Sequence, residues 1–126
     1  MADVPKRRRL DLLDKARNAA GVGIARLESL SNSGNPDIAA DAMADLVDAR
    51  NARDDLAVIR ALIDTKPENS LKPVSADDLA KLVNLENAID RRIRNSQLVS
   101  AGLAAATDVI QTAESIGQIL KEGAAG

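Results

Sequence analysis

The chain has 126 residues, a formal net charge of −2 and a hydrophobic fraction of 45%, so it is long enough to bury a core of its own. It contains no Phe, Tyr, Trp, His or Cys, and Ala alone supplies 23 residues. Without His, Cys and Tyr, most general acid–base and covalent catalysis is excluded, as are ordinary zinc, haem and iron–sulfur sites. We therefore expect a protein that is not an enzyme and that holds no cofactor and no metal.

The first predicted element is a helix over residues 5–31. Pro5 suits a helix start because its missing N–H is not needed there, and Asp3 can cap it. Gly21 and Gly23 interrupt the helix, and we interpret them as a close helix crossing, with a kink or hinge as the alternative. The apolar residues on one face are Leu10, Leu13, Ala16, Ala20, Ile24, Leu27 and Leu30.

Four adjacent cations open this helix, and they form a candidate anion contact: Lys6, Arg7, Arg8 and Arg9. Such a cluster can bind phosphates, an anionic membrane surface or an acidic partner. The alternative is a solvated first turn, where positive charge opposes the helix dipole and requires compensation. The slightly acidic net charge and the lack of aromatic residues disfavour nucleic acid as the partner.

A second helix is predicted over residues 36–64. Gly34 can end the first helix, Asn35 can cap the second, and Pro36 fits its first position. Because the link is short, the two helices should be antiparallel neighbours. The predicted buried stripe is Ile38, Ala42, Leu46, Ala49, Leu56, Ile59 and Ile63.

The second helix also carries an acidic stripe, formed by Asp37, Asp41, Asp45 and Asp48. A solvated acidic face is the simpler interpretation of this stripe. The alternative is that Asp45 and Asp48 lie opposite Arg91, Arg92 and Arg94 and align the second helix with the third.

A loop over residues 65–75 precedes a third predicted helix, which runs from 76 to 121 with Ser75 as its cap. Flexible ends are expected at 1–4 and 122–126. The positions of one face of the third helix, mostly apolar, recur at alternating three- and four-residue steps, with one missing step at Arg92, where Ile93 can take over; this heptad-like pattern is typical of coiled-coil packing. They are Leu82, Leu85, Ile89, Ser96, Val99, Leu103, Ala106, Ile110, Ala113, Gly117 and Leu120.

The third helix is longer than its neighbours: at ~1.5 Å per residue it spans nearly 70 Å, against about 40 Å for each of the others. Its second half would then expose an apolar stripe that needs a partner. We favour self-association of this stripe with a second subunit. One alternative is that a target protein covers it. The other is that the helix breaks between residues 95 and 102 and folds back as a fourth helix. The candidate partner or oligomer surface is Val99, Leu103, Ala106, Ile110, Ala113, Ile116, Gly117 and Leu120.

The sequence thus predicts one all-α domain over residues 1–126, an antiparallel bundle of three long helices, with a third helix broken into two as the alternative. The expected function is a non-catalytic helical protein–protein interaction or scaffold module that self-associates through the third helix. Its expected partner is a second copy of the chain or another helical protein. The alternative is a small regulatory protein that binds nucleic acid or another anion through its basic N-terminal segment. No apolar run is long enough to span a membrane, and without Cys a cytoplasmic location is the default expectation.

Overall fold

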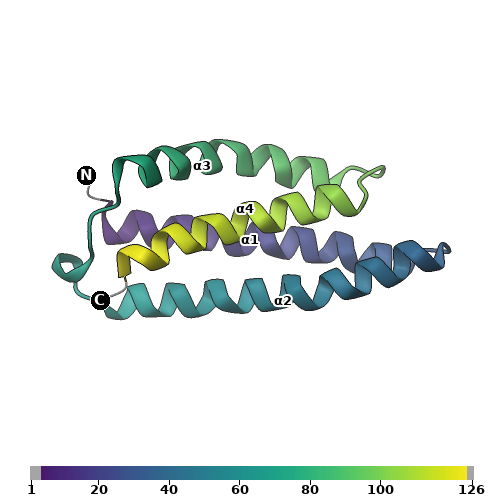
Figure 1. The fold of residues 1–126 in the computed structure, drawn as a ribbon, viewed down its shortest axis with the longest axis horizontal. Coiled ribbons are helices and arrows are strands. Elements are labelled where there is room, and N and C mark those ends of the chain that lie inside the picture. The colour runs from purple at the N-terminus through teal and green to yellow at the C-terminus, as the bar shows by residue number, and fades with distance from the viewer. Residues whose placement is uncertain (1–3, 125–126) are drawn as a thin grey trace.

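The computed structural model describes residues 4–124, and it consists of four long α-helices (Figure 1). The described residues contain no β-strand, which confirms the predicted all-α class. A short 3₁₀ helix, η1, lies in the link between the second and third helices. The bounds are α1 Lys6–Ser31, α2 Pro36–Thr65, η1 Glu68–Ser70, α3 Ala76–Gln97 and α4 Leu103–Ala124.

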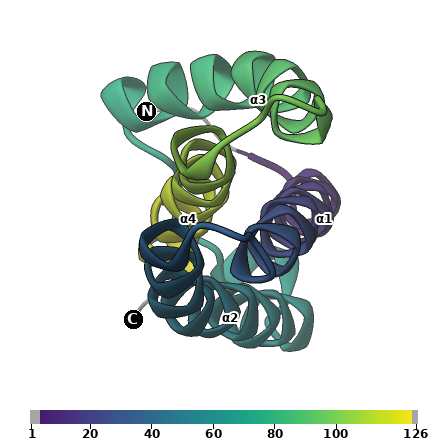
Figure 2. The ribbon, with the colours of Figure 1, turned by 90° about the vertical axis from the view of Figure 1, so that its right-hand side faces the viewer.

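The helices alternate in direction, and α1 and α4 form the centre of the bundle (Figure 1). These two helices pack against each other, while α2 and α3 lie on opposite sides of the α1–α4 pair (Figure 2). Both ends of the described chain lie at the same end of the bundle (Figure 1). At the other end, the α1–α2 hairpin extends beyond the α3–α4 hairpin (Figure 1).

The predicted third helix is not continuous: the chain breaks after Gln97 and folds back as α4, which is the alternative that the sequence left open for residues 95–102. Arg26 of α1 bonds to the backbone where α3 ends. Its Nε donates to the carbonyl of Ser96 at 2.9 Å, and its Nη2 donates to that of Leu98 at 2.7 Å. The last carbonyls of a helix have no partner within the helix, so these bonds stabilise the end of α3. Fold-back packs α4 against α1, α2 and α3, and its apolar stripe is thereby buried.

The predicted caps of α2 and α3 are confirmed. The side-chain oxygen of Asn35 accepts from the amide of Asp37 at 3.0 Å, and Pro36 follows at the first position of α2. The hydroxyl of Ser75 accepts from the amide of Asp78 at 3.1 Å. These bonds provide an acceptor for a backbone N–H group that has no acceptor within the helix at its N-terminus. The predicted cap Asp3 lies outside the described residues.

The ends of the chain are better packed than the sequence indicated. Val4 is buried, and α4 continues three residues beyond its predicted end at 121, to Ala124. The carbonyl of Gly123 accepts from the amide of Lys72 at 2.8 Å, so the α2–α3 link holds the last turn of α4.

Gly23 marks a close crossing between α1 and α4, as predicted, and α1 runs through it without a break. A Cβ placed on Gly23 would lie 2.6 Å from Cγ1 of Ile110 and 2.9 Å from Cγ1 of Val109, so any side chain at this position would force those two side chains to shift. Gly21 does not share this role, because a Cβ there would meet nothing within 4 Å. The close approach replaces the bulk that aromatic side chains would otherwise provide.

Candidate interaction surfaces

The predicted oligomer surface on the third helix is not a surface in the structure. Val99 is 99% exposed in the α3–α4 loop and Leu103 is half-buried, but the other members lie in the core of the single chain. The buried members are Ala106, Ile110, Ala113, Ile116, Gly117 and Leu120. Because α1, α2 and α3 already pack around α4, the argument that this stripe needs a second subunit no longer holds.

Lys6, the first of the four N-terminal cations, joins α1 to the end of α2. Its Nζ donates to the carbonyls of Asp64 at 2.7 Å and Lys66 at 2.8 Å. Its own amide lies 3.1 Å from both carboxylate oxygens of Glu68. The cation therefore stabilises the C-terminus of α2, and the carboxylate of Glu68 compensates the positive N-terminus of α1.

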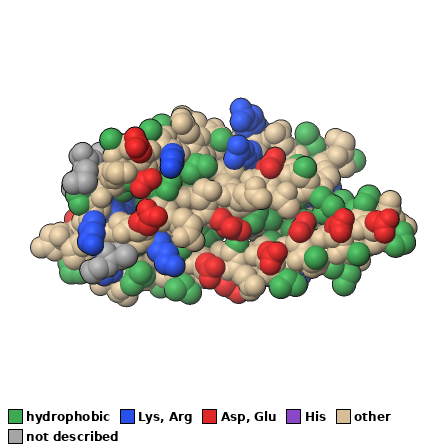
Figure 3. Space-filling view, viewed as in Figure 1, with side chains coloured by type: hydrophobic (Ala, Val, Ile, Leu, Met, Phe, Trp, Pro, Cys, Tyr) green, Lys and Arg blue, Asp and Glu red, His purple; other side chains and the backbone are tan. Residues whose placement is uncertain are grey.

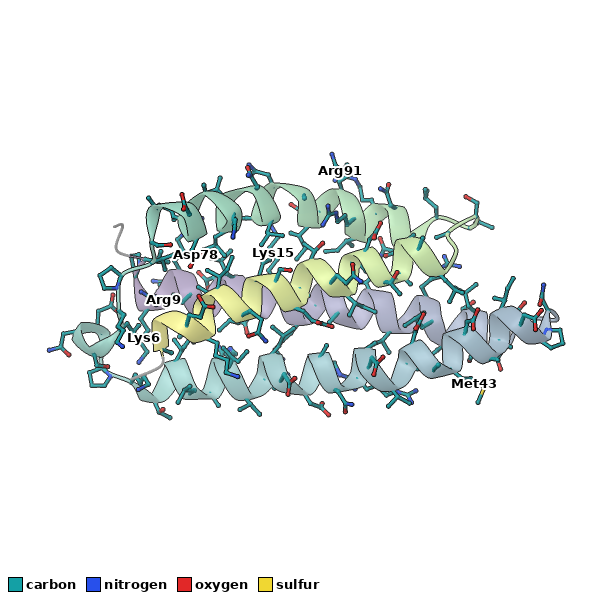
Figure 4. All side chains as sticks on the ribbon, in the orientation of Figure 1. Lys6, Arg9, Lys15, Met43, Asp78 and Arg91 are labelled. Atoms are coloured by element: carbon teal, nitrogen blue, oxygen red, sulfur yellow. The ribbon has the colours of Figure 1, made fainter. Side chains whose placement is uncertain are left out.

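Arg9 is buried at the same end of the bundle, close to the α2–α3 link (Figure 4). Its Nε donates to the carbonyl of Val4 and its Nη2 to that of Lys72, both at 2.7 Å. Gly123 gives it room, because a Cβ there would collide with the guanidinium. Arg9 thus ties the start of α1 to the link and to the end of α4.

Arg8 and Arg7 complete the basic segment. Arg8 donates to Glu86 of α3 at 2.8 Å, whereas Arg7 is exposed to solvent. Three of the four predicted anion contacts therefore hold parts of the chain together. Sequence analysis anticipated that charge at this helix start requires compensation, but it could not identify the distant residues that supply it.

The alternative pairing of Asp45 and Asp48 with the arginines at positions 91, 92 and 94 is wrong, because α2 and α3 lie on opposite sides of the bundle (Figure 2). Arg92 instead donates to the hydroxyl of Thr112 in α4, and Arg91 points away from the bundle on the outer side of α3 (Figure 4). The predicted register assumed that helices adjacent in sequence pack together, but the link between α2 and α3 crosses the α1–α4 pair.

Asp45 and Asp48 face α4, where they line shallow grooves together with Glu114. Figure 3 shows carboxylates following one another along this side of the molecule. Partial burial raises the pKa of Glu114 above its usual range, and the nearby charges of Asp48 and Asp55 raise it further. Within residues 4–124, however, no three acidic side chains converge in a way that could hold a metal ion.

Most of the large apolar side chains that are exposed within residues 4–124 lie on α2, and four of them lie on the side opposite its core stripe. Met43, Val47, Val58 and Leu62 are 61%, 59%, 67% and 40% exposed. Figure 4 shows Met43 directed away from the bundle. Together with the exposed side chains between them, these residues form what we call the outer face of α2.

Sequence analysis missed the outer face because it assigned one apolar stripe to each helix. The signal was present in the spacing. Met43 and Val47 are four residues apart, as are Val58 and Leu62, and eleven residues separate Val47 from Val58. Steps of four and eleven return to nearly the same side of an α-helix, since eleven residues complete about three turns.

Comparison with known proteins adds no relative: no family model, no curated protein and no solved structure matches this chain. A search of the described helices found none that is both long and apolar enough to cross a membrane.

Proposed function

We propose that this chain is a non-catalytic helical protein–protein interaction or scaffold module, and that it binds through the outer face of α2. The observation that carries this proposal is the row of large exposed apolar side chains at Met43, Val47, Val58 and Leu62. The row consists of two apolar clusters separated by exposed Arg50 and Asp54, and exposed apolar clusters rimmed by polar residues commonly mark a binding site. Helices α1 and α4 pack along the inner side of α2 and leave its outer face directed to solvent.

The alternative function, binding of nucleic acid or another anion through residues 6–9, has less support. Lys6, Arg8 and Arg9 already bond to carbonyl or carboxylate oxygens of the chain. A phosphate ligand would have to compete with those bonds. The two functions differ in their response to salt, because affinity for phosphates falls steeply with added salt and an apolar contact does not.

Site-specific photocrosslinking in cells tests the proposed function. A photoreactive amino acid replaces Val47 on the outer face, and a control variant carries it at Arg91, on the outer side of α3. We expect covalent adducts from position 47 that disappear when Val58→Lys is added, and fewer adducts from position 91. Equal adduct formation at the two positions, or adducts insensitive to Val58→Lys, would contradict binding through α2.

A further inference from the structure

The outer face of α2 is nearly symmetric about its own midpoint. The apolar residues Met43 and Val47 lie on one side of residues 52–53, and Val58 and Leu62 lie at matching distances on the other. At about 100° per residue, all four fall within roughly 60° of Val47 around the helix. Reversing the direction of the helix therefore leaves the pattern of apolar positions unchanged.

This symmetry makes the face complementary to itself in an antiparallel arrangement. If two copies of α2 align so that the numbers of facing residues add to 105, Met43 of one copy lies opposite Leu62 of the second copy. Val47 then lies opposite Val58 of the second copy. The two apolar clusters of each face are covered in a single alignment, which is the property that a two-fold dimer interface requires.

The charges at the centre of the face select the same alignment. Arg50 and Asp54 are exposed between the apolar clusters, and neither takes part in the three salt bridges found within residues 4–124. In the antiparallel pair, Arg50 of each copy lies beside Asp54 of the other. In a parallel pair, Arg50 would face Arg50 and Asp54 would face Asp54, so like charges would repel.

We propose that the partner of the outer face is a second copy of this chain, bound antiparallel about a two-fold axis that passes near residues 52–53. This inference rests on the proposed function and names its partner. The dimer is weak for two reasons. One helix face is smaller than the ~1,600 Å² of a standard interface. In addition, Asp48 of each copy lies close to Asp55 of the other, on the flank toward α4, so like charges repel there. We expect a dissociation constant on the order of 10–100 µM.

Light scattering over a concentration series from about 5 µM to 1 mM, the range around that dissociation constant, gives the first test. The mass should rise from that of the 13.3 kDa chain toward twice that value. Val58→Lys should keep the protein monomeric throughout the range, while the control Arg91→Asp, on the opposite side of the bundle, should dimerise as the unmodified chain does. A constant monomer mass for the unmodified chain would overturn the inference.

Charge reversal tests the alignment itself. Arg50→Asp and Asp54→Arg should each weaken self-association by at least about tenfold, because each places two like-charged pairs in the interface. A mixture of these two variants should associate again. The Arg50→Asp variant is acidic at both positions 50 and 54, the Asp54→Arg variant is basic at both, and the two therefore attract each other. Thermal melts of each variant alone show whether the fold is intact. If the two folded variants fail to associate when mixed, or if each alone dimerises normally, the antiparallel alignment is wrong.

The inference and the proposed function fail in different ways. A purified chain that stays monomeric, combined with adducts at position 47 to a different protein, would overturn the dimer and leave the interaction module standing. A monomer without specific adducts at position 47 would overturn both.

Discussion

Helices α2 and α4 are both rich in apolar residues, but they use them differently. The apolar stripe of α4 lies in the core, because α4 touches α1, α2 and α3. α2 touches α1 and α4 on its inner side, and its second apolar row, which includes Met43 and Val58, remains exposed. The apolar stripe of α4, which has the more regular heptad-like spacing, is covered by other helices of the same chain. The exposed row on α2 is therefore the better candidate for binding another protein.

The two helices should differ most in how much stability the protein loses when a charge is introduced. Ile116→Asp should unfold the protein or cost more than about 4 kcal/mol, since Ile116 is fully buried and no cation could pair with the new carboxylate without rearrangement. Val47→Asp, on the exposed outer face of α2, should change stability by less than about 0.5 kcal/mol. Thermal melts followed by circular dichroism measure both, and a similar loss in the two variants would contradict the assignment of core and surface.

The close packing of α4 can be tested by one substitution at two positions of α1. Gly23→Ala should destabilise the protein by about 1–3 kcal/mol, because its Cβ would press on Ile110 and Val109. Gly21→Ala has open space and should stabilise by about 0.5–1 kcal/mol through better helix propensity. Urea unfolding of both variants measures the contrast. Stabilisation by both substitutions would show that α4 does not approach α1 so closely.

The basic segment should contribute to stability through Lys6 far more than through Arg7. Lys6→Met removes the cation that bonds to the carbonyls of Asp64 and Lys66, so we expect a loss of about 1–2 kcal/mol. Arg7→Met removes the same charge from an exposed position and should cost less than about 0.5 kcal/mol. Urea midpoints measure both losses. Equal effects would favour a solvated basic patch over a structural one.

The smallest expected effect lies in the groove between α2 and α4. Because burial and then Asp48 and Asp55 raise the pKa of Glu114, ionisation of Glu114 disfavours the folded state. The protein therefore loses stability as the pH rises from the ordinary carboxyl pKa of about 4.3 through the raised value. Glu114→Gln should remove this loss and stabilise by less than about 1 kcal/mol at pH 7, after solvent screening.

The pH dependence distinguishes this cause from a simple packing effect. Near pH 3 the carboxyl group is neutral in both states, so Glu114→Gln and the unmodified chain should have similar melting temperatures. The control Glu28→Gln, at an exposed position on α1, should have little effect at either pH. A stabilisation by Glu114→Gln that persists unchanged at pH 3 would contradict the electrostatic explanation.

Local signals in the sequence predicted the helices well. Asn35 and Ser75 cap α2 and α3 as expected, and the predicted core stripe of α2 is buried except at Ile38, which is 36% exposed. Capping and helical periodicity depend on residues a few positions apart, so they can be derived from the sequence alone.

The features that the sequence missed or left open, the break before α4 among them, depend on contacts between distant residues. The heptad-like spacing continues through residues 98–102, while the bonds from Arg26 to the end of α3 come from about seventy positions earlier in the chain. The same holds for Lys6, whose partners belong to the end of α2. Which apolar row of a helix is covered also depends on where the other helices lie, so the exposure of Val47 could not be derived from α2 alone.

The fold-back of α4 is the central claim, because it covers the stripe of α4 and leaves α2 as the free surface. The distance between spin labels at Asn84→Cys and Gln118→Cys tests it directly in this cysteine-free chain, diluted with unlabelled protein to suppress signals between copies. Both positions are exposed and line the same groove between α3 and α4. Pulsed electron–electron double resonance should therefore give a distance of about 10–25 Å between the two labels. A single continuous helix would separate the two positions by about 50 Å, and that distance would contradict the fold-back.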